Sequence, residues 1–217
     1  MKYNVLALVA VIGLGSAPAN AAVNFVSDGT FTSPSGGTSF TTYSSPSSIG
    51  PWSVASGSVD LIGNYWQNPA GTSGSVDLDG NAPGSISQSL ALTSGKYELS
   101  FYLSGNPDGS PATKLLDVDL SSGSPLTSPY SYTLNGSSSH SDMQYIHESF
   151  EFTATGPTTL TFASADSGTP YGPVIGDVIV SAVPEPAAWS MLIFGIGAIG
   201  TMLRLGRRRQ SSRAMAA

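Results

Sequence analysis

The residues of this chain that could carry chemistry are carboxylates, two histidines and many serines. Glu148 and Glu151 come nearest to the acid pair of a glycosidase. They are three residues apart on a predicted strand, so they point to opposite faces and do not flank one bond. A hydrolase that uses Glu148, Glu151 or His147 is therefore the least favoured function that we carry forward, and we expect no enzyme activity.

Metal and nucleophile chemistry have equally weak support. His140 and His147 lack the close spacing of a zinc pair, and the absence of cysteine removes thiol ligands, thiol chemistry and disulfides. No serine stands in a Gly-x-Ser-x-Gly motif. The stretch Asp77–Asn81 alternates oxygen ligands as a calcium loop does. However, its glycine comes early and Gln88 replaces the closing glutamate, which favours a turn at a strand end and no metal.

Aromatic residues beside polar ones are better candidates, and the chemistry that they suggest is sugar binding. Sugar rings stack on aromatic faces while carboxylates and amides hydrogen-bond their hydroxyls. Such residues lie at predicted strand ends, whose loops converge at one end of a β-sandwich. The predicted glycan-binding residues are Tyr65, Trp66, Asn106, Asp108 and Tyr171. Core packing and sugar stacking remain equally open for Trp66, whereas Trp52 is assigned to the core.

The charge of residues 22–183 restricts the possible partners. This part has no arginine, and its two lysines stand against thirteen acidic residues, a formal net charge of −11. Such a surface repels nucleic acid and anionic lipid. Neutral sugars, cations and basic proteins remain suitable.

Alternation with a period of two recurs through this body and predicts the elements that position these residues. Tyr97, Leu99, Phe101 and Leu103 share one face of a strand, and Leu116 and Val118 share a face of another. Gly/Pro and Asn-Gly turns separate such runs, which indicates an all-β, two-sheet sandwich. Gly57–Asn64 is nearly repeated as Gly74–Asn81, predicting two similar strands around a loop with Tyr65 and Trp66. Residues 27–48 have little pattern and are predicted to form a long loop.

Both ends of the chain predict export. An apolar run follows Lys2, and Ala19-Asn20-Ala21 is a small-x-small site, so residues 1–21 form a predicted signal peptide cleaved after Ala21. An almost unbroken apolar run over 187–203 gives a helix of roughly 26 Å, slightly short of a bilayer core. The arginines after it predict a membrane span with the arginines in the cytoplasm and the body outside.

The tail resembles the PEP-CTERM sorting signal. The resemblance rests on Pro184-Glu185-Pro186, the Gly195–Gly197 run and the basic end with Arg207, Arg208 and Arg209. It implies that a membrane peptidase called exosortase cuts near Pro-Glu-Pro, where the two prolines hold the strip extended. A permanent single-span anchor is the alternative.

The body resembles the choice-of-anchor C family. The matching pieces are Gly50–Val54, Gly57–Trp66, Ser75–Gly80, Gly84–Gln88, Gly105–Gly109 and Tyr171–Pro173. The resemblance implies a galactose-binding-like jelly roll, related to carbohydrate-binding modules, and no enzymatic activity. Domains of this type often hold a structural calcium ion with a Glu and an Asp. Thr32 and Gly176 occupy those positions here, which disfavours calcium, although Asp28 or Asp177 could compensate.

These observations divide the chain into three parts: a signal peptide (1–21), a β-sandwich (22–183) and a sorting segment (184–217). We expect an exported, non-catalytic protein, membrane-anchored as a precursor and then held at the cell surface or in the extracellular matrix. Its expected partners are the exosortase-type peptidase and extracellular polysaccharide. The alternative is a structural matrix protein that contacts other proteins and binds no sugar.

Overall fold

The computed structural model describes residues 23–122, 129–184 and 196–197. The predicted signal peptide and nearly all of the sorting segment lie outside these residues. Within the described part, no helix is both long and apolar enough to cross a membrane.

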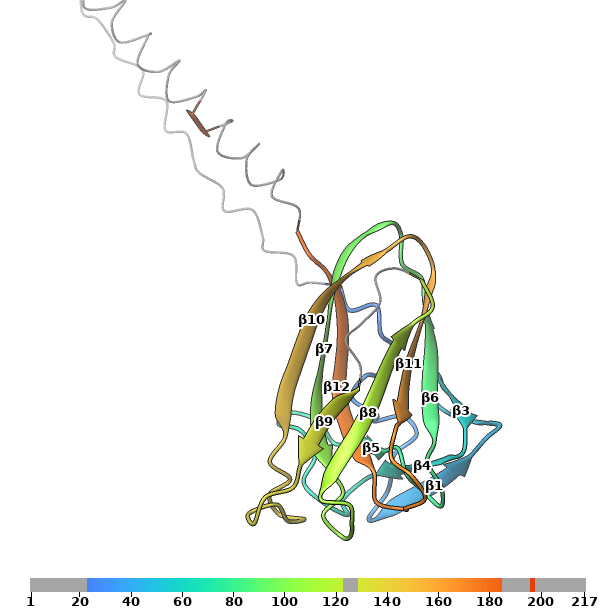
Figure 1. Ribbon diagram of the computed structural model, residues 1–217. Helices are drawn as coiled ribbons and strands as arrows, with labels where there is room; N and C mark the ends of the chain where they lie inside the picture. The colour runs from blue at the N-terminus through green and yellow to red at the C-terminus, as the bar shows by residue number, and fades with distance from the viewer. Residues whose placement is uncertain (1–22, 123–128, 185–195, 198–217) are drawn as a thin grey trace, which may run out of the picture.

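Two antiparallel sheets of six strands make up the described domain (Figure 1). The first sheet has the order β1-β4-β5-β12-β7-β10, and the second has the order β2-β3-β6-β11-β8-β9. The strands are β1 (Phe40–Ser44), β2 (Ser47–Ile49), β3 (Trp52–Ser56), β4 (Ser58–Ile62), β5 (Ser75–Asp77), β6 (Ser85–Leu90), β7 (Gly95–Gly105), β8 (Thr113–Leu120), β9 (Tyr130–Thr133), β10 (Ile146–Ala154), β11 (Thr158–Ser164) and β12 (Pro173–Ala182).

The order of the strands is that of a jelly roll. From β5 to β12 the chain passes repeatedly from one sheet to the other, so that the orders β5-β12-β7-β10 and β6-β11-β8-β9 face each other. The strands β4 and β1 extend the first sheet, and β3 and β2 extend the second. The all-β, jelly-roll prediction is confirmed.

The core lies between the sheets and follows the predicted alternation. Tyr97, Leu99, Phe101 and Leu103 of β7 are buried, while Glu98 is exposed. Opposite them, Phe162 of β11 packs edge-on against Phe101, with ring centroids 5.2 Å apart. Trp52 is completely buried and its indole N–H donates to the Asp28 carbonyl. Trp52 is therefore a core residue, as predicted.

The near-repeat forms two neighbouring strands. The strands β4 and β5 pair antiparallel, which sets Asp60 opposite Asp77 and Leu61 opposite Val76. The loop between them carries Tyr65 and Trp66, as predicted. The prediction of one long loop over 27–48 is wrong, because β1 lies inside it and β2 begins at its end, both at the sheet edges. An edge strand with little burial leaves a weak pattern in the sequence.

The N-terminal strip closes the sandwich beside β12. The Phe25 N–H donates to the Val180 carbonyl and the Val178 N–H donates to the Gly29 carbonyl. The Asp28 carboxylate accepts from the Thr32 N–H and hydroxyl and from the Ser33 N–H. Both of its oxygens thus hold their own loop together.

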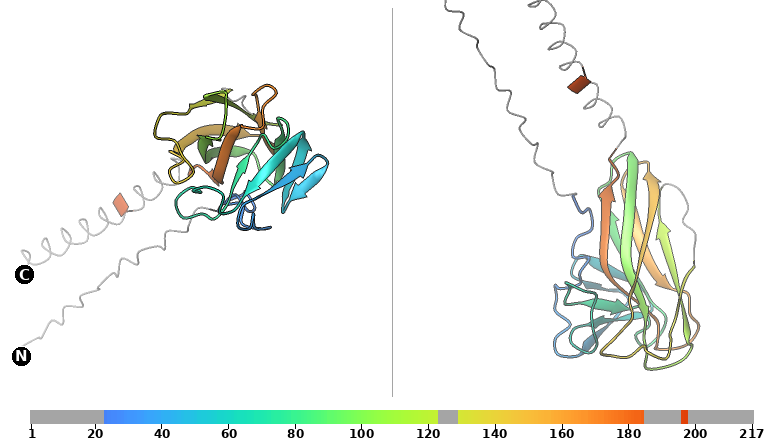
Figure 2. Two further views of the ribbon diagram at one scale, coloured as in Figure 1. Left: turned by 90° about the horizontal axis from the view of Figure 1, so that it is seen from below. Right: turned by 90° about the vertical axis from the view of Figure 1, so that its left-hand side faces the viewer.

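The strand β12 connects the two ends of the sandwich. It begins at Pro173, beside the loops β7–β8 and β11–β12, and ends at Ala182, where the polypeptide leaves the domain (Figure 2). Ten residues at about 3.3 Å each span about 33 Å. The start of the sorting segment is therefore far from the loops at the start of β12.

Candidate functional site

A pocket of about 220 Å³ opens at the loop end where β12 begins. The outer faces of β1 and β4 form one wall, and four loops form the rest. Its lining residues are Phe40, Thr42, Asp60, Ile62, Tyr65, Trp66, Gly80, Asn81, Asn106, Asp108, Pro170 and Tyr171. All five residues predicted to bind glycan line this one pocket. The structure therefore brings them together, and their role in binding remains a prediction.

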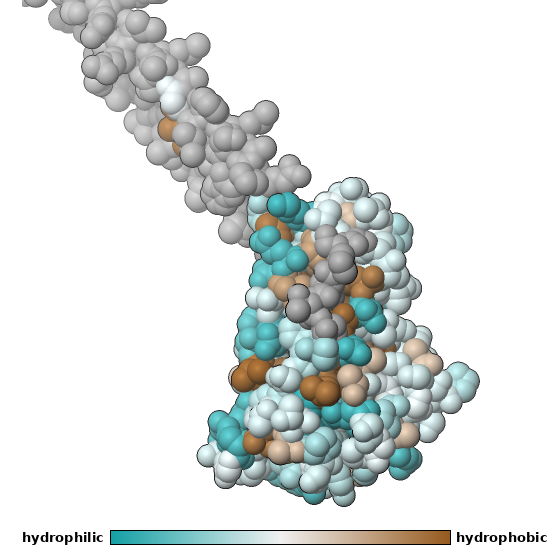
Figure 3. Space-filling view, in the orientation of Figure 1, coloured by the Kyte–Doolittle hydropathy of each residue, from teal (hydrophilic) through white to brown (hydrophobic). Residues whose placement is uncertain are grey.

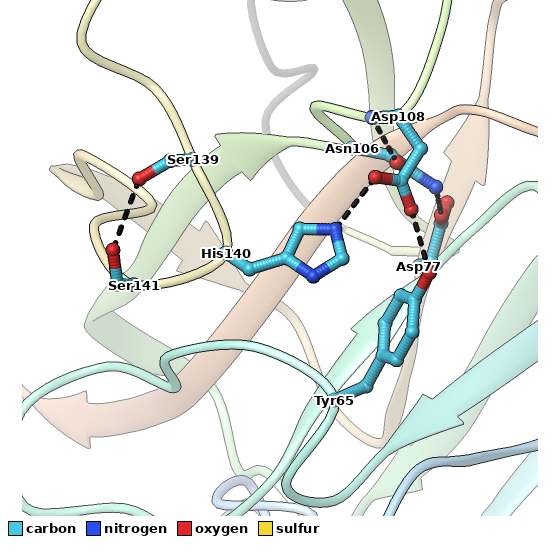
Figure 4. Close-up of polar contacts among 7 residues, drawn as sticks. All are labelled: Tyr65, Asp77, Asn106, Asp108, Ser139, His140 and Ser141. Carbon is cyan, nitrogen blue, oxygen red and sulfur yellow. Dashed lines mark hydrogen bonds and ion pairs between the residues drawn. The ribbon is translucent and has the colours of Figure 1, made fainter.

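Asp108 joins two loops at the rim of the pocket (Figure 4). Its Oδ2 accepts a hydrogen bond from the Tyr65 hydroxyl at 2.9 Å, and its Oδ1 lies 2.6 Å from His140 Nε2. The His140 ring also packs on Tyr65, with centroids 4.6 Å apart. The hydrogen bond to Asp108 raises the pKa of the Tyr65 hydroxyl. These contacts fix the Tyr65 ring as one side of the pocket.

Behind the rim, Asp77 is fully buried and anchors three segments. Its Oδ2 accepts from Asn106 Nδ2 at 2.7 Å, and its Oδ1 accepts from the N–H groups of Asp79 and Gly172. Burial raises the pKa of Asp77 well above its usual range, while the hydrogen bonds from Asp79 and Asn106 lower it. A side chain at Gly172 would meet the Asp79 Cγ at 2.6 Å, so this close approach requires glycine. Asp77 thereby holds the base of the pocket.

Lys114 joins the two loops that bear Asp108 and Tyr171. Its side chain is completely buried, and its Nζ donates to the carbonyls of Gly109 at 2.9 Å and Tyr171 at 2.6 Å. Burial lowers the pKa of Lys114, and the carboxylates of Asp166, Asp77 and Asp79 act in the opposite direction. This lysine therefore shapes the pocket from behind and does not line it.

The five predicted residues contribute in different ways. Tyr65, Asp108 and Tyr171 present accessible surface, whereas Trp66 is 5% exposed and Asn106 is 6% exposed. The Trp66 indole N–H donates to Ser75 Oγ, and the side-chain Oδ1 of Asn106 accepts from the Asp108 N–H. Of the two possibilities that the sequence leaves open for Trp66, the structure favours core packing, since little of its ring faces the cavity.

Sequence reasoning missed residues at two places. Phe40, Thr42 and Asp60 line the pocket from β1 and β4. Phe40 is 42% exposed and its ring lies 5.0 Å from that of Tyr65. The residues of β1 show no alternation of burial, so no pattern in the sequence marked this strand. His140 had no local signal either, because only the fold brings its loop to Asp108.

The groups considered for catalysis lie apart. Glu148 and Glu151 are on β10, an edge strand of the first sheet, and the alternation of burial puts them on opposite faces. Ser139 and Ser141 hydrogen-bond each other and point away from the His140 ring (Figure 4). Among the described residues, no group of three or more His, Asp or Glu side chains could hold a metal ion.

A second groove, of about 450 Å³, is wider and more open. Its lining residues are Gln67, Asn68, Ala70, Tyr102, Asp142, Gln144, Tyr145 and Ile146. Tyr102 is the aromatic residue of β7 on its outer face, and its ring packs against His147. This groove provides a natural internal comparison for any binding experiment.

An all-β jelly roll with an acidic, aromatic pocket at one end is the class that this structure defines. In sequence comparison, residues 182–209 match the PEP-CTERM protein-sorting motif, which confirms the predicted sorting signal. Halomucin of Haloquadratum walsbyi is 40% identical over 87 residues, which are 38% of this chain and 1% of halomucin. The chain thus spans about one hundredth of that relative's length.

Solved structures of similar architecture include carbohydrate-binding modules. TmCBM61, solved in complex with β-1,4-galactotriose, is 14% identical, with a TM-score of 0.46 over 75% of this chain and 100% of that one. CBM35 from Paenibacillus barcinonensis is 19% identical, with a TM-score of 0.42 over 66% of this chain and 99% of that one. The galactotriose is a ligand of TmCBM61.

Proposed function

We propose that this chain is an exported, non-catalytic protein that binds extracellular polysaccharide through the pocket at its loop end. The observation that carries the proposal is the convergence of Tyr65, Asp108 and Tyr171, from three separate loops, with Phe40 and Asp60 of the sheet edge. Aromatic rings supply surfaces for the apolar faces of a sugar, and the polar groups supply partners for its hydroxyls. The proposed ligand-binding residues are thus both aromatic and acidic.

The proposal includes a location. The sorting motif at 182–209 is the basis for export, membrane anchoring of a precursor and cleavage by an exosortase-type peptidase. The motif begins at the end of β12, about 33 Å along that strand from the pocket. A domain held through its tail would direct the pocket away from the membrane, towards polymer outside the cell. On this proposal the body is a choice-of-anchor C domain of the cell surface or matrix.

Affinity electrophoresis tests this function. The full chain, purified in a non-ionic detergent, is run through gels with and without the exopolysaccharide of the producing cell. We expect retardation by the polysaccharide, and its loss in Tyr171→Ala. Tyr102→Ala, which removes a tyrosine from the second groove, is the matched control and should keep the retardation. Equal retardation of both variants, or none for the unaltered protein, contradicts the proposal.

For the alternative of a structural matrix protein, an extended apolar surface would be the sign of a permanent protein interface. On the face seen in Figure 3, hydrophobic residues appear as separate patches among polar ones. In the described sandwich, Val23, Phe40 and Ile146 are the exposed large hydrophobic side chains, and Phe40 belongs to the pocket. Obligate protein interfaces are larger and more apolar than this. A specific protein captured by the chain, together with flat glycan titrations, would favour the alternative.

One observation favours glycan hydrolysis as a second candidate, because two carboxylates, Asp60 and Asp108, line one pocket. Burial raises the pKa of Asp60, as a general acid would require, while the Thr42 hydroxyl lowers it. Both oxygens of Asp108 are engaged by Tyr65 and His140, however, which supports the non-catalytic proposal. Release of reducing ends that disappears in Asp60→Asn would support hydrolysis.

A further inference from the structure

The charge of the pocket is one-sided. Two carboxylates, Asp60 and Asp108, line it together with neutral residues, and neither lysine nor arginine does. The described domain has two lysines. Lys114 donates to loop carbonyls behind the pocket. Lys96 is exposed near the start of β7, where it stands opposite Thr153 of β10 in the strand register. The imidazole of His140 is already paired with Asp108 at the rim, so a ligand carboxylate would enter a negative site without a free lysine or arginine to receive it.

One oxygen of the Asp60 carboxylate is available to accept a hydrogen bond from a ligand. Its Oδ1 accepts from the Thr42 hydroxyl at 2.6 Å, and the described residues provide no hydrogen-bond donor to its Oδ2. Asp60 is half-buried, and burial raises its pKa because the charged form is partly desolvated. The opposite residue across the strand pair is another acid, Asp77. A cationic donor from a ligand would offset this electrostatic cost directly.

Aromatic rings stand beside this carboxylate. Phe40 lies on β1 two residues before Thr42, the partner of Asp60, and its ring is 5.0 Å from that of Tyr65. Tyr171 lines the same cavity. An aromatic face attracts a cation as well as the apolar face of a sugar. The pocket thus combines what a sugar ring requires with what an ammonium group requires.

We propose that this pocket selects amino sugars, with the protonated amine of a hexosamine unit donating to Asp60 Oδ2 while the sugar ring lies against the aromatic wall. This proposal rests on the proposed function and specifies its ligand class. The favoured polymer is a partly or fully deacetylated hexosamine glycan. Neutral glycans bind without the ammonium contact, and uronic acid polymers are repelled.

Isothermal titration of the full chain in non-ionic detergent tests the selectivity. The three probes are the β-1,4 trimers of glucosamine and N-acetylglucosamine and the trimer of galacturonic acid, at a mildly acidic pH where the amine is protonated. We expect the glucosamine trimer to bind about tenfold tighter than its acetylated counterpart, as one charge-assisted hydrogen bond provides. The galacturonate trimer should bind least.

The matched variants are Asp60→Asn and Asp119→Asn, which change the net charge equally. Asp119 is exposed on β8 of the other sheet, so its replacement should leave the tenfold preference unchanged. Asparagine keeps an acceptor for Thr42, and Asp60→Asn should abolish the preference while the acetylated trimer still binds.

Each outcome decides a different question. Equal binding of the two hexosamine trimers overturns the amino-sugar proposal and leaves glycan binding intact. A preference that survives Asp60→Asn also overturns it. If the unaltered protein binds none of the trimers and none of the producer's polysaccharide, the proposed function itself fails.

Discussion

The replacement Asp79→Asn tests whether a buried carboxylate next to the site is held at an electrostatic cost. Asp79 has no exposed surface, and neither of its carboxylate oxygens accepts a hydrogen bond from a described residue. Burial raises the pKa of Asp79 from 3.8 to about 6, against the effects of the nearby Ser164 hydroxyl and the Lys114 ammonium group. The folded protein therefore holds this proton more tightly than the unfolded chain does.

The sign and size of the effect follow from linkage. Because the folded-state pKa is higher, the contribution of Asp79 to stability is complete below pH 3.8 and is lost as the pH rises through about 6. A shift of roughly two pKa units corresponds to about 3 kcal/mol of unfolding free energy. Asparagine lacks this titration. Burial of its amide changes the free energy of unfolding by an amount that does not vary with pH.

Urea denaturation of both proteins between about pH 4 and pH 8 measures this difference. We expect the stability of Asp79→Asn relative to the unaltered protein to rise by about 3 kcal/mol across that interval. Asp119→Asn, the replacement of an exposed carboxylate, should show nearly no such change. A stability difference between Asp79→Asn and the unaltered protein that stays constant with pH would refute the assignment of a raised pKa to Asp79.

Three further replacements probe the framework of the site. Lys114→Met should lower the unfolding free energy by about 2 kcal/mol in urea and weaken polysaccharide binding, because two loops lose their shared donor. Gly29→Ala should cost about 2 kcal/mol, since its Cβ would lie 1.9 Å from the Val178 carbonyl oxygen. In Gly29→Ala, hydrogen exchange should show that the backbone amide of Phe25 loses protection. Trp52→Ala should cost about 4 kcal/mol by emptying the core, and a loss below about 1 kcal/mol would contradict its packing role.

Local patterns of the sequence predicted the framework because the framework depends on local periodicity. Alternation in β7 and β8 predicted buried and exposed faces, and the two copies of Gly-Ser-Val-Asp-Leu predicted two matching strands. The predicted turns between strands also placed Tyr65, Asp108 and Tyr171 on loops. In the jelly roll these loops lie together at one end.

Long-range contacts could not be predicted in this way. The sequence separates His140 from Asp108 by 32 residues, and nothing local marks their contact. Trp66 follows Tyr65 directly, but one ring is buried against Met143 and Val174 while the other faces the pocket. The role of Asp60 depends on the pairing of β1 with β4, an edge that local burial barely marks. The wall of the pocket that carries the amino-sugar proposal was therefore visible only in the structure.

The most direct test of the central claim is a map of amide chemical-shift changes in the isotopically labelled protein as an oligosaccharide of the producer's polymer is added. Our account predicts that the largest changes fall on Asp60, Tyr65, Asp108 and Tyr171, around the loop-end pocket. Changes centred on Tyr102 and Ile146, in the second groove, would contradict it, as would a spectrum that does not respond.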